Sequence, residues 1–194
     1  MTRSRMTAEQ RRESIIHAAT HVFATAGYQR GTVSDIAAQV GVTEPVVFQN
    51  FGSKAALFAI VLDRVGDQMS ARLTDDGRSP VELLRAFFSA HHQNRLHSPG
   101  SPGVLFQDAM MLTGEPAIAK AARRATRAVA AAVADLFERA QQAGELRAEI
   151  DPQAAAWWLM SLIHSRAFRT AFAPDHGKLE EHLVDMAFCA WRNT

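Results

Sequence analysis

The segment from Thr32 to Phe51 combines the residue types and the spacing that reading double-stranded DNA requires. Ile36 and Ala37 give a short helix a face to bury, and Gly41 supplies the left-handed residue of a tight turn. Two short helices joined by such a turn form a helix-turn-helix, whose second helix enters the major groove of DNA. The segment therefore predicts a DNA-binding element. The plainer alternative is a short helical hairpin inside a core.

The second helix of this element has a clear start in the sequence. Thr43 can cap it, and Pro45 stands in its first turn, where a backbone N–H would have had no partner. We expect Val47, Phe48 and Phe51 to anchor this helix inward or against a supporting helix. Its remaining face is then free to meet a partner.

The residues around the two helices suit two kinds of DNA contact. Hydroxyl groups, helix N-termini, amides and cations suit phosphates, and the candidates are Thr32, Ser34, Thr43, Asn50 and Lys54. The second helix is expected to read the bases. Gln49 can pair with adenine, and Glu44 can accept a hydrogen bond from the amino group of cytosine. Pro45 or Val46 can touch a thymine methyl group.

Four arginines precede this element in the chain: Arg3, Arg5, Arg11 and Arg12. A basic lead-in of this kind can lie along the DNA backbone or enter the minor groove. The alternative is that it serves only as a charged, solvated tail.

The composition is that of an ordinary globular protein and limits the other classes of partner. The 194 residues are 47% hydrophobic and 21% charged, with 21 Lys plus Arg against 20 Asp plus Glu, a net charge of +1. No bulk charge therefore attracts nucleic acid or a membrane surface. The single cysteine, Cys189, predicts a reducing cytoplasm, and no apolar run reaches the ~18 to 20 residues of a membrane span. We expect no membrane partner and no export.

The helix signals predict an all-α fold of about nine helices. The expected ranges are 7–26, 33–40, 44–50, 54–74, 80–97, 103–112, 116–143, 152–172 and 176–191. Starts are marked by Thr7 with Gln10, Thr32 with Asp35, Ser79 with Glu82, and Asp151 before Pro152. The short helices predict a three-helix DNA-binding domain over residues 1–53. The longer ones predict a helical bundle over 54–194 for ligand binding and dimerisation.

Residues 9 to 60 resemble the TetR family of bacterial transcriptional regulators, without a gap. The resemblance is carried by Ile15-Ile16-His17-Ala18-Ala19, Val22-Phe23, Gly27-Tyr28, Thr32-Val33-Ser34-Asp35-Ile36-Ala37, Gly41-Val42-Thr43, Phe51-Gly52-Ser53-Lys54 and Leu57-Phe58. Over the rest of the chain only the helical pattern and the length are similar. The resemblance implies a homodimer that binds a palindromic operator and a repression that a small molecule relieves.

The chain departs from the family where the family contacts DNA. Phe48 stands where the family usually has a tyrosine, so a phenolic phosphate contact is lost, although Phe48 remains among the DNA-facing candidates. Asn50 replaces a frequent histidine, and Glu44-Pro45-Val46 replaces a Lys-Gly-Thr type of sequence. The operator sequence therefore cannot be taken from relatives.

The C-terminal part is rich in aromatic and thioether side chains, which line adaptable apolar pockets as well as cores. Together with polar groups that would orient a small apolar or amphipathic effector, the expected pocket residues are Phe87, Phe88, His91, Phe106, Gln107, Met110, Met111, Trp158 and His164. The last two helices carry more apolar residues than one seam can bury. We expect a dimer interface from Leu159, Ile163, Leu179, Leu183 and Met186.

No catalytic set and no cofactor site emerges, so the sequence does not predict an enzyme. His17 and His21 have a spacing that can hold zinc, but they fall on the polar side of their helix and lack a third ligand. We therefore expect no metal. A second possibility is a DNA-tethered factor that regulates a protein partner without an inducer, and a third is a small bundle enzyme with metal at the histidines.

Overall fold

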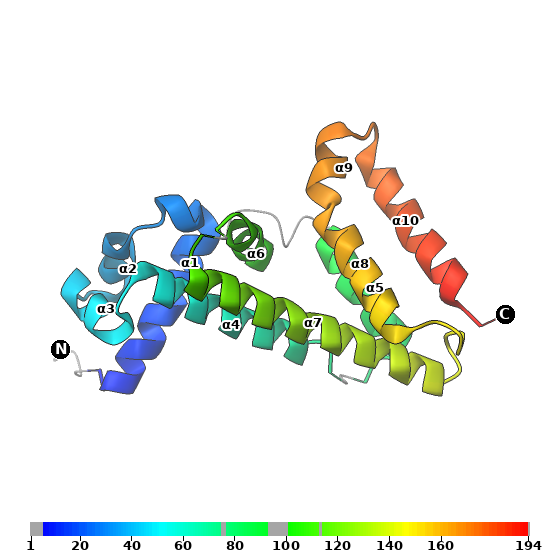
Figure 1. The fold of residues 1–194 in the computed structure, drawn as a ribbon, viewed down its shortest axis with the longest axis horizontal. Helices are drawn as coiled ribbons and strands as arrows, with labels where there is room; N and C mark the ends of the chain where they lie inside the picture. The colour runs from blue at the N-terminus through cyan, green and yellow to red at the C-terminus, as the bar shows by residue number, and fades with distance from the viewer. Residues whose placement is uncertain (1–5, 75–76, 93–100, 113, 194) are drawn as a thin grey trace. The chain divides into compact units, whose positions relative to one another are not determined.

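Good helix formers recur throughout the chain, and most of the residues that the computed structural model describes are helical. It describes residues 6–74, 77–92, 101–112 and 114–193, and over these the all-α prediction is confirmed (Figure 1). The helices of this part are α1 (Ala8–Arg30), α2 (Val33–Val40), α3 (Glu44–Phe51), α4 (Lys54–Ala71), α5 (Pro80–His92), α6 (Pro102–Met111), α7 (Pro116–Gln142), α8 (Pro152–His164), α9 (Arg166–Phe172) and α10 (His176–Trp191).

The predicted helix starts are confirmed by their hydrogen bonds. The Thr7 and Thr32 hydroxyls each accept a hydrogen bond from the backbone N–H three residues on. The side chains of Gln10 and Asp35 in turn accept the backbone N–H of Thr7 and Thr32. The Ser79 hydroxyl accepts the N–H of Glu82 at 3.2 Å. Such caps satisfy backbone N–H groups that the first helical turn leaves without partners.

The expected helix over 152–172 is wrong, because it is two helices that meet at Ser165. The Ser165 hydroxyl donates to the Leu162 carbonyl at 3.1 Å, and His164 Nδ1 lies 2.7 Å from the Met160 carbonyl oxygen. Side chains that bind nearby backbone groups in this way compete with the regular helix. No glycine or proline marks this break.

The first helix continues beyond its expected end. Gly27 interrupts it with φ 79° and ψ 163°, but a further turn follows to Arg30. The Asp108 carboxylate of α6 accepts the backbone N–H of Tyr28 at 2.5 Å, directly after the break. Asp108 therefore replaces a helical hydrogen-bond partner that the break removes.

A Gly27→Ala variant should lose about 1–3 kcal/mol of unfolding free energy. Alanine is strained at the backbone angles of Gly27, and its Cβ would lie 3.1 Å from Asp108 Oδ2. Urea unfolding followed by circular dichroism measures the loss. Gly114→Ala is the control, because nothing lies within 4 Å of a Cβ there. Equal midpoints for both variants would contradict the assignment.

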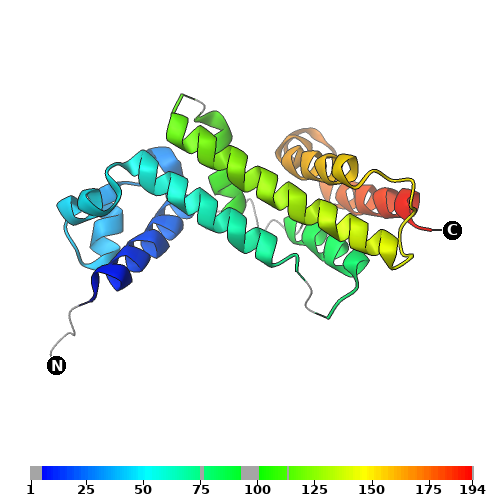
Figure 2. The same cartoon turned by 60° about the horizontal axis from the view of Figure 1, so that its bottom comes forward.

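The described helices form two compact units. The first contains α1 to α3, α4 as far as Gly66, α6, and α7 as far as Ala125. In its core the Phe58 ring lies against those of Phe23 and Tyr28, at centroid distances of 5.1 and 4.8 Å. The first parts of α4 and α7 lie side by side in this unit, where Arg124 and Asp63 form an ion pair (Figure 2).

The second unit contains the end of α4, α5, the rest of α7, and α8 to α10. Its core includes Leu84, Phe88, Phe137, Leu159 and Phe188. Cys189 lies exposed on α10. The division by contacts falls after Gly66 and after Ala125, and the functional division at residues 53 and 54 stays a prediction.

No single helix in the described part of the chain has the length and composition to cross a membrane. Only α3 and α4 taken as a pair, bent by 65°, meet that test. Val47, Phe51, Leu57 and Phe58 of this pair are buried inside the protein.

Candidate nucleic-acid interface

The helix-turn-helix has the geometry that the sequence predicts. Gly41 adopts the left-handed conformation with φ 75°, and its N–H donates to the Ala37 carbonyl. Ile36 and Ala37 are buried on α2, and Val47 and Phe51 are buried on α3. The turn therefore brings the apolar faces of two short helices into the core of the first unit.

The start of α3 differs from the expectation in one respect. Thr43 occupies the cap position with extended backbone angles, but its side chain makes no capping hydrogen bond. Pro45 lies in the first turn as predicted. The hydroxyl of Thr43 is thus not used by the helix that it precedes.

The expectation that Phe48 packs inward is wrong, because its side chain is 43% exposed. Val47 and Phe51 are four residues apart and fill the inner face of α3, and Phe48, which directly follows Val47, lies on another side of the helix. Phe48 joins Glu44, Pro45 and Gln49 on the exposed part of α3, and Val46 is half-buried. These residues form the proposed reading surface.

Asn50 and Lys54 both make contacts inside the protein. The Asn50 amide donates to the Val46 carbonyl at 2.7 Å. Lys54 Nζ lies 4.6 Å from the centre of the Tyr28 ring and donates to the Gln29 carbonyl at 3.3 Å. Partial burial lowers the pKa of Lys54. One of the three N–H groups of the ammonium is thus used, and two remain for a phosphate.

Thr32 and Ser34 lie exposed at the start of α2. The Thr32 hydroxyl donates to the Asp35 carboxylate at 2.6 Å, and this bond, with one from the Thr32 backbone N–H, lowers the pKa of Asp35. Sequence reasoning missed Ser53, whose hydroxyl accepts the N–H of Ala56 at 3.0 Å in the first turn of α4. A serine directly before the expected start of a helix at residue 54 is a capping signal, and this signal could have identified Ser53 from the sequence.

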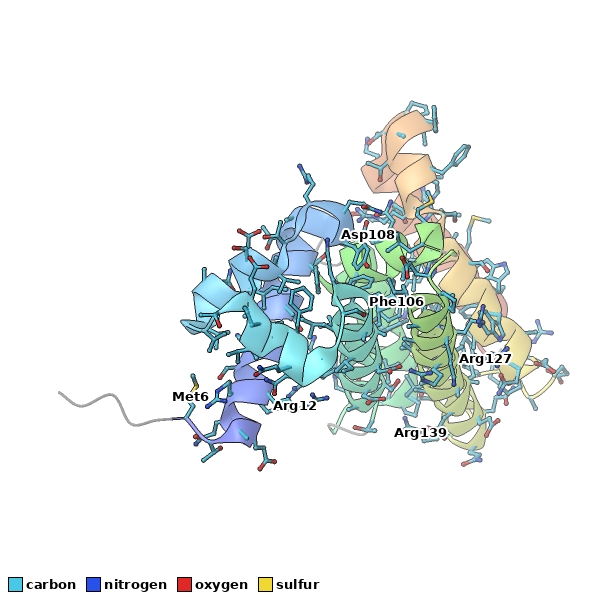
Figure 3. The ribbon with its side chains drawn as sticks, turned by 60° about the vertical axis from the view of Figure 1, so that its left-hand side comes forward. Met6, Arg12, Phe106, Asp108, Arg127 and Arg139 are labelled. Carbon is cyan, nitrogen blue, oxygen red and sulfur yellow. The ribbon has the colours of Figure 1, made fainter. Side chains whose placement is uncertain are left out.

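Of the four lead-in arginines, Arg3 and Arg5 lie outside the described residues. Arg11 and Arg12 belong to the first turns of α1 rather than to a tail. Figure 3 labels Arg12, which contacts the end of α3 instead of extending from the protein. Neither the arm nor the solvated tail, the two alternatives that the sequence left open, describes these two residues.

The predicted pocket residues divide between the two units. The first unit contains Phe106, Gln107, Met110 and Met111 of α6; the second contains Phe87, Phe88, Trp158 and His164, while the side chain of His91 lies outside the description. Phe88 is buried in the core of its unit, and its place in a pocket stays a prediction. That the others form one pocket stays a prediction.

Sequence reasoning missed a cavity of about 320 Å³ in the first unit. It is lined by α1 between Ala24 and Arg30 and by Val104 and Asp108 of α6. Figure 3 labels Asp108 and Phe106 on α6. None of the predicted pocket residues lines this cavity. The related signal in the sequence is Gly27, which predicts a helix end rather than a cavity.

The predicted dimer residues also differ in exposure. Leu159 and Ile163 are buried in the core of their own chain, and their place in a dimer interface stays a prediction. Leu179, Leu183 and Met186 follow one another at helical spacing on α10, and Met186 is 68% exposed. Aromatic side chains exposed on α8 and α9 are Trp157, Trp158, Phe168 and Phe172.

The histidines do not come together in the part of the chain that is described. Among those residues no group of three or more His, Cys, Asp or Glu side chains could hold a metal ion. His17 and His21 are exposed on α1. The polar face predicted for them is confirmed.

Comparison with known proteins agrees with this geometry. Residues 15–61 match the family model of bacterial regulatory proteins, tetR family. Over 142 residues the chain is 32% identical to the HTH-type transcriptional activator FasR of Mycolicibacterium smegmatis. The aligned residues cover 70% of this chain and 63% of that protein. It is 31% identical over 105 residues to the nucleoid occlusion factor SlmA of Photobacterium profundum, covering 52% of this chain and 54% of that protein. The chain thus spans less than two thirds of either relative.

Solved structures share the fold. A TetR-family regulator from Cytophaga hutchinsonii superposes with a TM-score of 0.75 at 16% identity, covering 98% of this chain and 100% of that one. A SmeT–triclosan complex superposes with a TM-score of 0.71 at 22% identity, covering 94% of this chain and 92% of that one. The fold and the site define a helix-turn-helix regulator. The chain belongs to the TetR family of bacterial transcriptional regulators.

Proposed function

We propose that this protein is a repressor that binds a palindromic DNA operator as a homodimer and leaves it when a small apolar or amphipathic molecule binds. The reading surface of α3 carries the proposal: Val47 and Phe51 hold the helix inward, while Gln49 is exposed. One helix-turn-helix reads one half-site. Two copies related by a two-fold axis therefore require a palindromic operator.

Three further parts complete the proposal: an effector, a location and the absence of catalysis. The solved SmeT–triclosan complex has the same fold, and Met110 and Met111 offer adaptable apolar surface for an effector. We place the protein in the cytoplasm, where its DNA would be, and assign it no catalytic activity. Because one relative is named a transcriptional activator, a promoter reporter assay with and without the protein distinguishes repression from activation.

Substitutions at a phosphate contact and at a base contact should have different effects on DNA binding. Duplexes enriched from a random library by the wild-type dimer supply the operator. Lys54→Ala should weaken binding to operator and scrambled duplex alike and reduce the salt slope by about 1, because a phosphate contact is lost. Gln49→Ala should cost about 1–3 kcal/mol on the operator only. Fluorescence anisotropy at several salt concentrations measures both.

The outcomes of this experiment are distinct. If Gln49→Ala lost affinity equally for both duplexes, Gln49 would not be a residue that reads a base. Enrichment of no duplex by the wild-type protein would overturn the proposed function.

A DNA-tethered factor that regulates a protein partner without an inducer is the second candidate. The burial of Phe88 favours it, because a filled C-terminal core leaves less room for an inducer. So does the similarity to a protein named a nucleoid occlusion factor. Native mass spectrometry of the purified protein would favour the first candidate if a small molecule accompanies it.

A further inference from the structure

Arg12 joins α1 to the end of α3 through two separate contacts. Its Nη1 donates to the Asn50 carbonyl oxygen at 3.0 Å, across 38 residues of sequence. Its guanidinium carbon lies 4.5 Å from the centre of the Phe51 ring. Arg12 is half-buried, so both contacts are partly shielded from water. A planar guanidinium can stack on a ring and donate at its edge at the same time.

The place where Arg12 binds is the weak end of the reading helix. The last carbonyls of a helix lack intrahelical partners, and a cation there also meets the negative end of the helix dipole. α3 has only eight residues and stops at Gly52, whose φ of 77° turns the chain away. A helix this short depends on outside contacts for its position. Arg12 supplies one at the last two residues of α3.

We propose that Arg12 is a positioning residue for DNA reading, which fixes where the exposed side chains of α3 meet the bases and does not itself hold a phosphate. This inference rests on the proposed function. It assigns a role to a cation that the sequence alone groups with a DNA-contacting arm. Gln49 directly precedes Asn50, so a shift at the end of α3 moves the residue proposed to read a base.

Arg11 gives a matched control. It is the preceding residue on α1, carries the same charge, and is also half-buried. Its guanidinium donates at 3.4 Å to the Met6 carbonyl, near the start of its own helix. Arg11→Met and Arg12→Met therefore remove the same charge from the same turn, but only the second removes the contacts with Asn50 and Phe51.

The test compares affinity for the enriched operator with affinity for a scrambled duplex. In Arg12→Met this ratio should fall at least about fivefold, because one base contact is lost when its side chain is misplaced. The salt slope should stay unchanged. Arg11→Met should keep the wild-type ratio. Arg12→Lys keeps the charge but loses the planar contact, and should restore the ratio only in part. Hydrogen exchange should be faster at the amides of Val47 to Phe51 in Arg12→Met than in Arg11→Met.

Each other outcome overturns the inference in a recognisable way. A salt slope reduced by about 1 with full rescue by Arg12→Lys would make Arg12 a phosphate contact. Equal losses on both duplexes with a lower melting temperature would mean that Arg12 only stabilises the fold. Equal rates of hydrogen exchange in α3 for both variants would show that Arg12 does not fix the position of this helix. Failure of the wild-type protein to enrich any duplex would instead overturn the proposed function, and the role in reading with it.

Discussion

Replacing Glu180 with leucine should lower the unfolding free energy by about 3–5 kcal/mol, because it leaves a buried guanidinium without its carboxylate. Glu180 of α10 is 2% exposed, and the side chain of Arg169 of α9 is 11% exposed. Arg169 Nε and Nη2 donate to the two carboxylate oxygens at 2.5 and 3.0 Å. Urea unfolding followed by circular dichroism measures the loss.

A neighbouring residue and the partner of Glu180 provide the controls. Glu181→Leu changes an exposed neighbour and should stay within about 0.5 kcal/mol of the wild type. The double variant Glu180→Leu/Arg169→Met should recover much of the stability, since a buried ion pair can often be replaced by apolar side chains. A double variant no more stable than Glu180→Leu would show that the loss has another source.

Replacing Met186 with glutamate should convert the proposed dimer into monomers of 21.3 kDa and abolish operator binding. Met186 is 68% exposed in the single chain, so the change leaves the core intact. An unpaired charge from each protomer would then be buried in the interface. The dissociation constant of the dimer should rise about 100-fold or more. Analytical ultracentrifugation at micromolar concentration measures the mass.

Met111→Glu is the matched change away from α10. Met111 lies on α6 and is 83% exposed, so this variant should keep the mass of the wild type. Equal masses for wild-type protein and Met186→Glu would remove Met186 from the interface. Ile163 is unsuitable for this test, because it is buried and a charge there would disturb the fold.

Local signals in the sequence were enough for several helix starts and for the turn of the DNA-binding element. Thr32 and Asp35 cap a helix through bonds three residues apart, and the left-handed angles of Gly41 follow from the residue type. Such features depend on a few neighbouring residues. That is why they could be predicted without the rest of the fold.

The features that were missed depend on contacts distant in sequence or on small local differences. Arg12 lies far from Asn50 along the chain, and its role is visible only when α1 and α3 are packed. Phe88 is apolar whether it fills a core or lines a pocket, so its type cannot distinguish the two. The break at Ser165 results from side chains that bind their own helix, with none of the residues that usually mark a stop.

The exposed position of Cys189 on α10 gives the protein a built-in attachment point for probes. The chain has a single cysteine, so a maleimide dye or a nitroxide would react at one defined thiol without any substitution. In a two-fold symmetric dimer the two nitroxides would yield one inter-spin distance, and a monomer would yield none. Cys189 stands three residues after Met186 on α10, so the mass of the labelled protein must first match that of the unlabelled protein. Pulsed electron resonance on the labelled wild-type protein then follows assembly, and any change in it caused by an effector.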